Sequence, residues 1–489
     1  MVLANPEIDV SRGGQRATRW RPLQPSIASV WGAIAVLVPM AATWLHQTMA
    51  IDLAYQIRAG ELMLDTHRLL RSDPFTFTVH GQPWLNQQWL AEVLFAAVWR
   101  IGGWNGIAFV WGLLVGVTTF LVYRACLQTG ATARNSAFVT LAGYVVGVQI
   151  LTLRPQLFGI VSFALAQWII VSRRRTPRRL WLIPLVVICW ANTHGSFPLV
   201  FILLFIAWLE DRHLDPVSAR QLVLVGLLSV AATVANPWGL KAWSYIADVA
   251  SHPVVSSHIA EWGPPSLRDP TGQLFFLSLF CVGILLARTK GPIPWPTLIG
   301  LGAFALISLF AIRGVVWWAL AFPVLVSPLL DAARTDQPAP SRINFVAIAL
   351  LATVVAVSFS MTRGIDPATG GPSVLSFAPE KLVAATRGVV PAGSRVFVSE
   401  VDASWVEYSA PELPVFVDPR IEIFPDRIWE DYFVISSGRQ GWEAILDRWG
   451  IDALILDPHY ADGLLLVIGD SSHWKLIEQD QDGSVYVRT

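Results

Sequence analysis

Charged residues are scarce in this sequence: Asp, Glu, Lys and Arg together make up 14% of its 489 residues, whereas apolar residues make up 54%. Charged residues normally supply about a quarter of a soluble domain, so a water-soluble fold is excluded for most of the chain. The 35 basic and 35 acidic residues cancel to a formal net charge of +0, which removes any argument from bulk charge for nucleic-acid binding. No nucleic-acid partner is expected.

Cysteine is equally rare. Cys126, Cys189 and Cys281 each lie in or at the end of an apolar run, and the polar C-terminal region has no cysteine. No pair has the spacing of metal ligands, so neither a disulfide framework nor a zinc site is expected. The thiols are interpreted as small apolar side chains.

Long apolar runs are abundant. A helix needs roughly 17–25 residues to cross a bilayer, and about eleven candidate spans can be placed, several of them short. They are Ile27–Thr48, Ile107–Cys126, Ala137–Leu153, Leu157–Val171, Leu180–Thr193, Phe197–Leu209, Leu222–Val234, Leu274–Ala287, Pro296–Ile312, Val315–Leu330 and Phe345–Phe359. Gln88–Ile101 differs, because Glu92 and Arg100 interrupt apolar residues at helical spacing, and it is predicted to be an amphipathic helix on the membrane surface. We expect a polytopic α-helical membrane protein.

Basic residues recur in alternate connections, and short cytoplasmic loops are enriched in Lys and Arg. If the N-terminal tail is cytoplasmic, the bases that share its side are Arg124, Arg134, Arg173, Arg174, Arg175, Arg178, Arg179, Arg212, Arg220, Arg288, Lys290, Arg334 and Arg342. The pattern predicts a multi-pass protein of the cell inner or plasma membrane with a cytoplasmic N-terminus. It divides the chain into a cytoplasmic tail (1–26), a transmembrane domain (27–361) with a long first outer loop (49–106), a linker (362–376) and an extracytoplasmic domain (377–489).

The last part of the chain changes composition. A Gly/Pro/Ser-rich linker precedes a region in which short strands alternate with helices, and this pattern is typical of a small α/β domain. The expected strands are Arg395–Ser399, Val415–Asp418 and Ala453–Asp457, the expected helices are Asp426–Ile435 and Trp442–Trp449, and Trp474–Glu478 and Ser484–Arg488 are expected to form a hairpin. Asp482-Gly483 is a favoured turn pair between the two hairpin strands.

The first outer loop gathers acids, amides, His and Trp beside the membrane. Asp52 follows the first span, and a helical turn there would hold it rigidly, as a general base must be held to meet a substrate hydroxyl. Asp73 is a second catalytic candidate, although Asp before Pro also opens ordinary turns. Trp84, Asn86 and Gln87 are candidate substrate-binding residues that offer an aromatic face and amides to a sugar, although aromatic residues are also common at membrane interfaces.

Polar residues also interrupt the outer ends of later odd-numbered spans, as Arg154, Asn192, His194, Asn236 and Arg313. An arginine between apolar segments needs an anion or a water-filled cavity, and its planar fork suits phosphate. Arg154 and Arg313, assisted by His194, are therefore candidates for a lipid phosphate, with Asn236 as a further substrate-binding residue. The alternative is that each arginine pairs with a loop carboxylate or extends to lipid headgroups.

These features together resemble the GT-C superfamily of membrane glycosyltransferases. The residues around Asp52 resemble the Asp-containing first-loop motif of that superfamily. Two further stretches resemble bacterial integral membrane proteins related to the protein mannosyltransferase and arabinosyltransferase branches. They are Arg71-Ser-Asp-Pro-Phe-Thr-Phe-Thr, followed by Gly81-Gln-Pro-Trp-Leu-Asn-Gln-Gln-Trp-Leu, and Val417-Asp-Pro-Arg-Ile-Glu-Ile-Phe-Pro. The resemblance implies transfer of a sugar from a polyprenyl-phosphate-linked donor to a glycan, lipid or protein acceptor among membrane lipids. Asp52 would be the base, with help from Asp73, and basic residues would grip the lipid phosphate.

The sequence departs from some branches of that superfamily. It has no WWDYG-like motif in the C-terminal region, and Asp52-Leu53 replaces a paired acid after the first span. Peptide glycosylation and an obligatory metal are therefore not implied, and a divalent metal stays open as a cofactor.

Two other functions compete with glycosyl transfer. A lipid-linked-saccharide transporter or flippase usually has repeat symmetry and interrupted helices at mid-membrane, and the sequence has no detectable repeat. A non-catalytic scaffold that keeps the same membrane fold stays open, because a fold does not secure a function.

Overall fold

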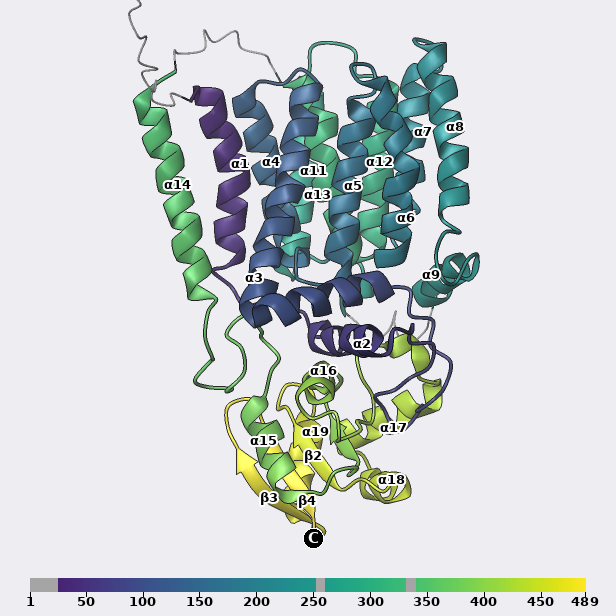
Figure 1. Cartoon of the computed structure of the whole chain (residues 1–489), viewed down its shortest axis with the longest axis vertical. Coiled ribbons are helices and arrows are strands. Elements are labelled where there is room, and N and C mark those ends of the chain that lie inside the picture. The colour runs from purple at the N-terminus through teal and green to yellow at the C-terminus, as the bar shows by residue number, and fades with distance from the viewer. Residues whose placement is uncertain (1–24, 252–259, 331–339) are drawn as a thin grey trace, which may run out of the picture.

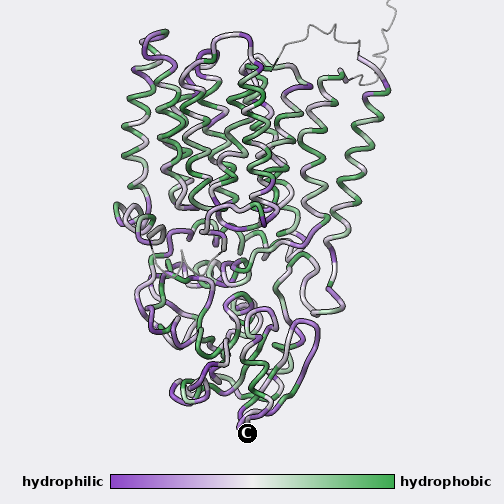
Figure 2. The backbone as a smooth tube through the Cα atoms, turned by 180° about the vertical axis from the view of Figure 1, so that it is seen from behind, coloured by the Kyte–Doolittle hydropathy of each residue, from purple (hydrophilic) through white to green (hydrophobic). Residues whose placement is uncertain are grey.

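In the computed structural model, residues 25–251, 260–330 and 340–489 are described, so most of the predicted cytoplasmic tail and Arg334 lie outside the described residues. The apolar part of the chain forms a helical bundle, and the polar C-terminal region packs beneath one end of it (Figure 1). We call this the domain-facing end and the opposite one the far end. Figure 2 shows hydrophobic stretches along the bundle helices and hydrophilic stretches at both ends.

Each predicted span corresponds to a helix in the described part of the chain. The helices are α1 (Ile27–Thr43), α3 (Trp89–Gln128), α4 (Ala133–Gly147), α5 (Pro155–Val171), α6 (Ile183–Thr193), α7 (Leu199–Asp211), α8 (Pro216–Ala232), α11 (Pro270–Arg288), α12 (Trp295–Phe310), α13 (Val315–Val326) and α14 (Arg342–Met361). Among the residues that the structure describes, four helical segments are long and apolar enough to cross a membrane by length and composition, namely Trp89–Gln128, Pro270–Arg288, Ile312–Leu329 and Arg342–Met361. The polytopic helical class is therefore supported, while the number of spans stays a prediction.

Local sequence explains where several helices begin. The Asp215 carboxylate accepts a hydrogen bond from the Ser218 amide, and Pro216 occupies the first position of α8. Asp269 and Pro270 begin α11 in the same way, with Gly272 as the donor. A side-chain acceptor satisfies amides that have no partner within the helix, and proline lacks the amide that would be left over.

Helix α3 bends at Gly103, whose φ of 54° and ψ of −150° lie in a region that other residues rarely adopt. The bend separates a first half that lies across the domain-facing end, beside α2 (Leu53–Thr66), from a second half that runs through the bundle (Figure 1). A helix is therefore present over the stretch that was predicted to lie on the membrane surface, but it continues directly into the helix of the second predicted span. Gly60 lets α2 pack closely against the first half of α3, since a Cβ atom at position 60 would lie 2.1 Å from the Glu92 carbonyl oxygen.

Glycines also permit close helix contacts inside the bundle. Gly112 and Gly116 lie four residues apart on α3, and added Cβ atoms would meet Trp44 and Met40 of the α1 region at 2.1 and 2.5 Å. Gly143 of α4 similarly faces the Ala319 carbonyl of α13 at 2.3 Å. Small residues at these contacts are typical of helix packing in membranes.

The C-terminal domain has a four-stranded sheet in the order β1-β2-β4-β3. Its strands are β1 (Val396–Val398), β2 (Ala453–Leu456), β3 (Trp474–Gln479) and β4 (Ser484–Arg488), and its helices are α15 (Glu380–Val389), α16 (Glu400–Ser409), α17 (Asp426–Ser436), α18 (Trp442–Trp449) and α19 (Asp462–Val467). Strands β1 and β2 pair in parallel, and β4 pairs antiparallel with both β2 and β3. The predicted β3–β4 hairpin is confirmed, as are α17 and α18 within a residue or two.

The strand predicted at Val415–Asp418 is wrong. This segment forms only single bridges, from Val415 to Val396 and to Thr76 of the first outer loop. Pro414 and Pro419 flank it and lack the amide hydrogens that a longer ladder needs. The segment instead connects the domain to the first outer loop.

Candidate active site at the domain-facing end

A chain of alternating charges begins at Asp52. Asp52 precedes α2, and its Oδ1 lies 3.1 Å from Nε of Arg154, which precedes α5. Arg154 Nη1 donates to both carboxylate oxygens of Glu261 at 2.9 Å, and Nη2 donates to the Met49 carbonyl at 3.1 Å. Both Nη groups of this buried guanidinium are hydrogen-bonded within the protein, and Nε lies within ion-pair distance of Asp52 without an aligned hydrogen bond.

Glu261 continues the chain to Arg313. Its Oε2 lies 3.3 Å from Arg313 Nε, and the Arg313 guanidinium lies over the Trp262 ring at 5.3 Å. Burial opposes ionisation of Glu261, but Arg313 and Arg154 outweigh burial and lower its pKa. The Arg313 side chain is 31% exposed, whereas that of Arg154 is 8% exposed, so Arg313 is the more accessible cation. We call Asp52, Arg154, Glu261 and Arg313 the charge chain.

A cavity of about 360 Å³ adjoins the charge chain. Its lining residues are Gln87, Gln88, Gln156, His194, Gly195, Ser196, Pro198, Leu199, Tyr245, Ile246, Trp262, Ile307, Ala311, Arg313, Gly314 and Trp317. Asp52 is not a lining residue, but Gln56 Nε2 donates to Asp52 Oδ2 at 3.0 Å and contacts Gln88 Oε1 at 3.4 Å. The carboxylate is thus one side chain away from the cavity wall, and Arg313 carries the positive charge of the lining.

His194 lies in the turn between α6 and α7 with a defined tautomer. Its Nδ1 accepts from the Ser196 amide at 3.1 Å and lies 2.8 Å from Ser196 Oγ, which itself accepts from Trp190 Nε1. The ring proton is therefore on Nε2. Burial, followed by the charge of Arg313, lowers the pKa of His194 to about 3, so the ring is a neutral hydrogen-bond donor. Gly159 makes room for this arrangement, because a Cβ atom there would lie 2.8 Å from Ser196 Oγ.

Asp73 is not brought to Asp52. It is 2% exposed and accepts from the Phe75 amide and from the amide and hydroxyl of Thr76. Its Oδ1 also pairs with Arg420 Nη2 of the C-terminal domain at 2.5 Å. The structure therefore gives Asp73 the role of an anchor between the first outer loop and the C-terminal domain, and its predicted help to the base has no geometric support.

Three of the predicted sugar-binding residues, Trp84, Asn86 and Gln87, are almost fully buried. Trp84 is 4% exposed and lies under the Arg420 guanidinium at 4.5 Å, and Asn86 is 2% exposed and donates to Glu92 Oε2. Trp84 is covered by Arg420 of the C-terminal domain, and Asn86 is held against Glu92 of α3. Gln87 does line the cavity, where its Nε2 donates to the Ala191 carbonyl.

Asn236 stabilises its own turn after α8. Its amide donates to the Thr233 carbonyl, and its oxygen accepts from the Trp238 amide. It borders a separate groove with Trp89 and Asn192. This placement does not support its predicted contact with substrate in the main cavity.

The sequence interpretation missed Glu261 and Tyr245. Glu261 belongs to a short 3₁₀ turn, Ala260–Trp262, and Tyr245 to α9 (Lys241–Ser251), both in the connection between α8 and α11. The available signals were an acid beside a tryptophan, Glu261-Trp262, and an amphipathic segment at Lys241–Ser251. Among the residues that the structure describes, no cluster of three or more His, Cys, Asp or Glu is arranged to hold a metal ion.

The overall architecture matches solved membrane glycosyltransferases. The chain aligns over 94% of its length with 74% of the Archaeoglobus fulgidus oligosaccharyltransferase in the apo form, at a TM-score of 0.60 and 13% identity. It aligns over 95% of its length with 99% of ArnT from Cupriavidus metallidurans in the apo state, at a TM-score of 0.54 and 12% identity. Archaeal oligosaccharyltransferase AglB from Archaeoglobus fulgidus, in complex with an inhibitory peptide and a dolichol-phosphate, aligns over 94% of this chain and 74% of its own at a TM-score of 0.52 and 11% identity.

No protein-family model matches the sequence, and a search of curated proteins finds no match. Oligosaccharyltransferase and ArnT are both GT-C glycosyltransferases, so the structural likeness confirms the predicted GT-C fold. At these identities the likeness establishes the fold alone.

Proposed function

We propose that the protein is a membrane glycosyltransferase that moves a sugar from a polyprenyl-phosphate-linked donor to a glycan, lipid or protein acceptor on the extracytoplasmic face. The observation that carries this proposal is the charge chain, which connects a carboxylate beside α2 to an accessible arginine in the cavity wall. The neighbour with bound dolichol-phosphate supports a lipid-linked donor. The basic connections at the far end support a cytoplasmic placement of that end.

Asp52 is proposed as the general base. It accepts the proton of the acceptor hydroxyl while the acceptor oxygen bonds to the anomeric carbon and the bond from that carbon to the phosphate oxygen breaks. Its ion pair with Arg154 and its hydrogen bond from Gln56 fix the direction of the carboxylate. The side chain is 18% exposed, so the carboxylate is not fully closed off from solvent.

Arg313 and His194 are proposed to receive the phosphate. Both line the cavity, and Arg313 supplies a positive charge while Nε2 of His194 supplies a neutral donor. Such groups stabilise the charge that develops on the leaving phosphate. Arg154, predicted from the sequence to share this role, has its guanidinium nitrogens committed to Asp52, Glu261 and Met49, so its role becomes that of orienting the two carboxylates.

Asp52→Asn tests the base. Purified protein in lipid nanodiscs would be incubated with decaprenyl-phosphate-linked sugars and a cell-envelope acceptor fraction, and transfer would be followed by mass spectrometry. Loss of a general base is expected to lower turnover by about 100- to 10,000-fold. Asp65→Asn is the matched control, because Asp65 lies in the last turn of α2, which Asp52 precedes, and its 60% exposed side chain pairs with Arg100 away from the cavity.

Equal turnover of the Asp52→Asn and Asp65→Asn variants would remove the base assignment. Tolerance of Asp52→Asn together with a co-purifying transferase would favour the scaffold instead. Movement of the lipid-linked sugar across the membrane without a covalent product would favour a flippase.

A further inference from the structure

The segment Asp418–Glu422 of the C-terminal domain is anchored to the first outer loop through Arg420. Arg420 is 2% exposed, pairs with Asp73 and Asp418, and lies against the rings of Trp84 and Phe75 at 4.5 and 5.1 Å. A planar guanidinium that pairs with two carboxylates and stacks on aromatic faces has one orientation available to it. The position of the residues that follow Arg420 is therefore set by this anchor.

Glu422 lies two residues beyond the anchor and reaches the cavity wall. Its Oε1 accepts a hydrogen bond of 2.7 Å from the Tyr245 hydroxyl. Tyr245 belongs to α9 and lines the cavity with Ile246, Gln87 and Arg313. Through this one contact the C-terminal domain determines where a cavity-lining side chain lies.

The direction of the hydrogen bond determines what Tyr245 offers to a ligand. The single hydroxyl proton is directed at Glu422, so the remaining lone pair of the oxygen is an acceptor for a ligand O–H or N–H group. Burial, and then the charge of Glu422, raise the pKa of Tyr245 well above its usual range, so the phenol stays neutral.

We propose that Tyr245 is a specificity-determining residue that accepts a hydrogen bond from a hydroxyl group of the donor sugar, and that Glu422 is the positioning residue that holds it. The C-terminal domain thereby takes part in choosing the sugar. This inference rests on the proposed function, since it assumes that the cavity receives the sugar of a lipid-linked donor.

The test measures equilibrium binding and steady-state turnover in nanodiscs with decaprenyl-phosphate-linked hexoses and the corresponding analogues that each lack one hydroxyl. Tyr245→Phe keeps the ring and removes the acceptor, so binding and KM of the hydroxylated sugar are expected to weaken by about tenfold, with kcat changed less than twofold. One deoxy analogue is expected to bind Tyr245→Phe and the wild-type protein equally. Tyr460→Phe, on an exposed tyrosine of the C-terminal domain, is the control.

Glu422 is tested separately. Glu422→Gln keeps an oxygen acceptor for Tyr245 and is expected to bind as the wild-type protein does, whereas Glu422→Ala is expected to reproduce the pattern of Tyr245→Phe. Glu430→Ala, on the exposed face of α17, is the control. Hydrogen exchange of α9 is expected to rise in Glu422→Ala and not in Glu422→Gln, which reports the positioning role without any assay of activity.

The outcomes separate the inference from the proposed function. If Tyr245→Phe weakens all analogues equally, or binds the hydroxylated sugar as tightly as the wild-type protein, Tyr245 does not read a hydroxyl and the inference fails. If the wild-type protein binds the lipid-linked sugars with this pattern but never transfers one, the proposed function fails while the inference stands for a binding protein. Unchanged exchange of α9 in Glu422→Ala would exclude the positioning role.

Discussion

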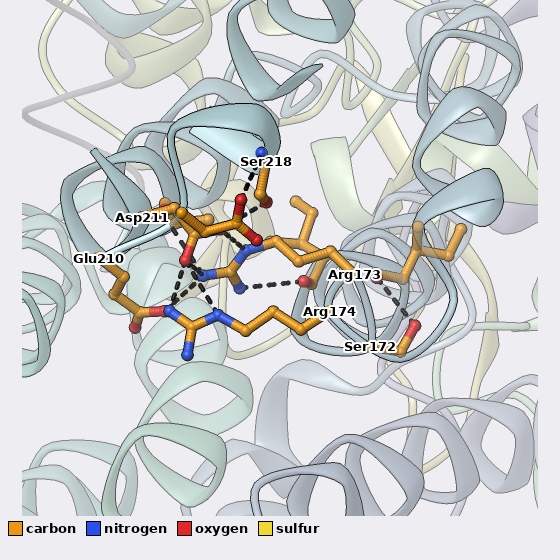
Figure 3. Close-up of polar contacts among 10 residues, drawn as sticks. Ser172, Arg173, Arg174, Glu210, Asp211 and Ser218 are labelled. Carbon is orange, nitrogen blue, oxygen red and sulfur yellow. Dashed lines mark hydrogen bonds and ion pairs between the residues drawn. The ribbon is translucent and has the colours of Figure 1, made fainter. Parts of the chain in front are cut away.

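Asp211 at the far end of the bundle and Asp52 at the domain-facing end both pair with arginines, but their surroundings differ. The Asp211 carboxylate is fully buried and accepts hydrogen bonds from Nε and Nη2 of Arg173 at 2.6 and 2.9 Å. It also accepts hydrogen bonds from Nη2 of Arg174 at 2.5 Å and from the Ser218 hydroxyl at 2.6 Å. Figure 3 shows these side chains converging on the one carboxylate. Asp52 has one arginine and one amide as partners and stays partly exposed.

The cavities beside these two groups of charged residues also differ in volume. The cavity that touches Arg173 measures about 50 Å³, whereas the cavity beside Arg313 measures about 360 Å³. A carboxylate whose lone pairs are all occupied, next to little free space, can only support the fold. Asp52 has fewer partners, is 18% exposed and lies one side chain from a cavity with an accessible cation, so it has fewer competitors for a ligand. We call Asp211, Arg173, Arg174 and Ser218 the far-end cluster. We infer that this cluster holds α5 against α7 and α8, while the charge chain belongs to the proposed glycosyl transfer.

The largest effect is expected from Asp211→Ala. Removing this carboxylate leaves Arg173 buried without its partner, and breaking a buried ion pair in this way destabilises proteins by about 3–5 kcal/mol. Thermal unfolding of the purified protein in nanodiscs measures the loss. Asp65→Ala removes an exposed ion pair and is expected to change stability by less than about 1 kcal/mol. Equal effects of both variants would contradict the structural role given to the far-end cluster.

The second effect concerns pH and the stability of the C-terminal domain. Burial raises the pKa of Asp402 to about 7, and the negative charges of Asp457 and Asp482 add to this rise. The hydrogen bond from Ser399 acts in the opposite direction but is outweighed. The folded state therefore binds more protons than the unfolded state between about pH 4 and pH 7, and stability falls as pH rises through this window by about 1.4 kcal/mol per unit. Asp402→Asn is expected to flatten the dependence of the unfolding temperature on pH. An unchanged slope would assign the dependence to other groups.

A third, smaller effect is expected from Arg313→Gln. Hydrogen bonds to charged groups contribute about 1.5–3 kcal/mol, so binding of decaprenyl phosphate is expected to weaken by about 10- to 100-fold. The unfolding temperature is expected to stay close to that of the wild-type protein, because this side chain is 31% exposed. Arg288→Gln, at the far end of α11, is the control in the same binding assay. Equal affinities of the two variants would remove Arg313 from the phosphate site.

The smallest effect is expected from Arg174→Ala. Arg174 is 50% exposed, and Arg173 already contacts both oxygens of Asp211. The loss of stability is expected to be under about 1 kcal/mol, measured by the same unfolding assay. A loss as large as that of Asp211→Ala would show that the far-end cluster is less saturated than its contacts indicate.

Hydrophobicity and local turn chemistry predicted much of the fold. Every predicted span contains a helix, and the hairpin around Asp482-Gly483 has its expected strands. These features depend on short stretches of sequence. Helix α16 was missed, and the segment at Val415 was wrongly predicted to be a strand. Helix α16 packs against α2, for example through the hydrogen bond from the Tyr55 amide to Ser404 Oγ. These two residues lie 349 positions apart in the sequence, so the contact leaves no local signal.

The candidate site was predicted in part. Asp52, Arg154, His194, Arg313 and Gln87 do gather at the domain-facing end, because each lies in or beside a connection at that end of the bundle. The structural roles of Asp73 and Trp84 could not be predicted from the sequence. Their role depends on Arg420, which arrives from the other end of the chain and takes up the surfaces that had been assigned to substrate.

The sequence by itself determined that this is a helical membrane protein with a polar C-terminal domain, since apolar length and the spacing of polar breaks are local properties of the chain. Only the tertiary structure decided which charges face each other. The energy of an ion pair depends on distance and burial, and residues such as Arg154 and Glu261, 107 positions apart, acquire both only when the bundle closes.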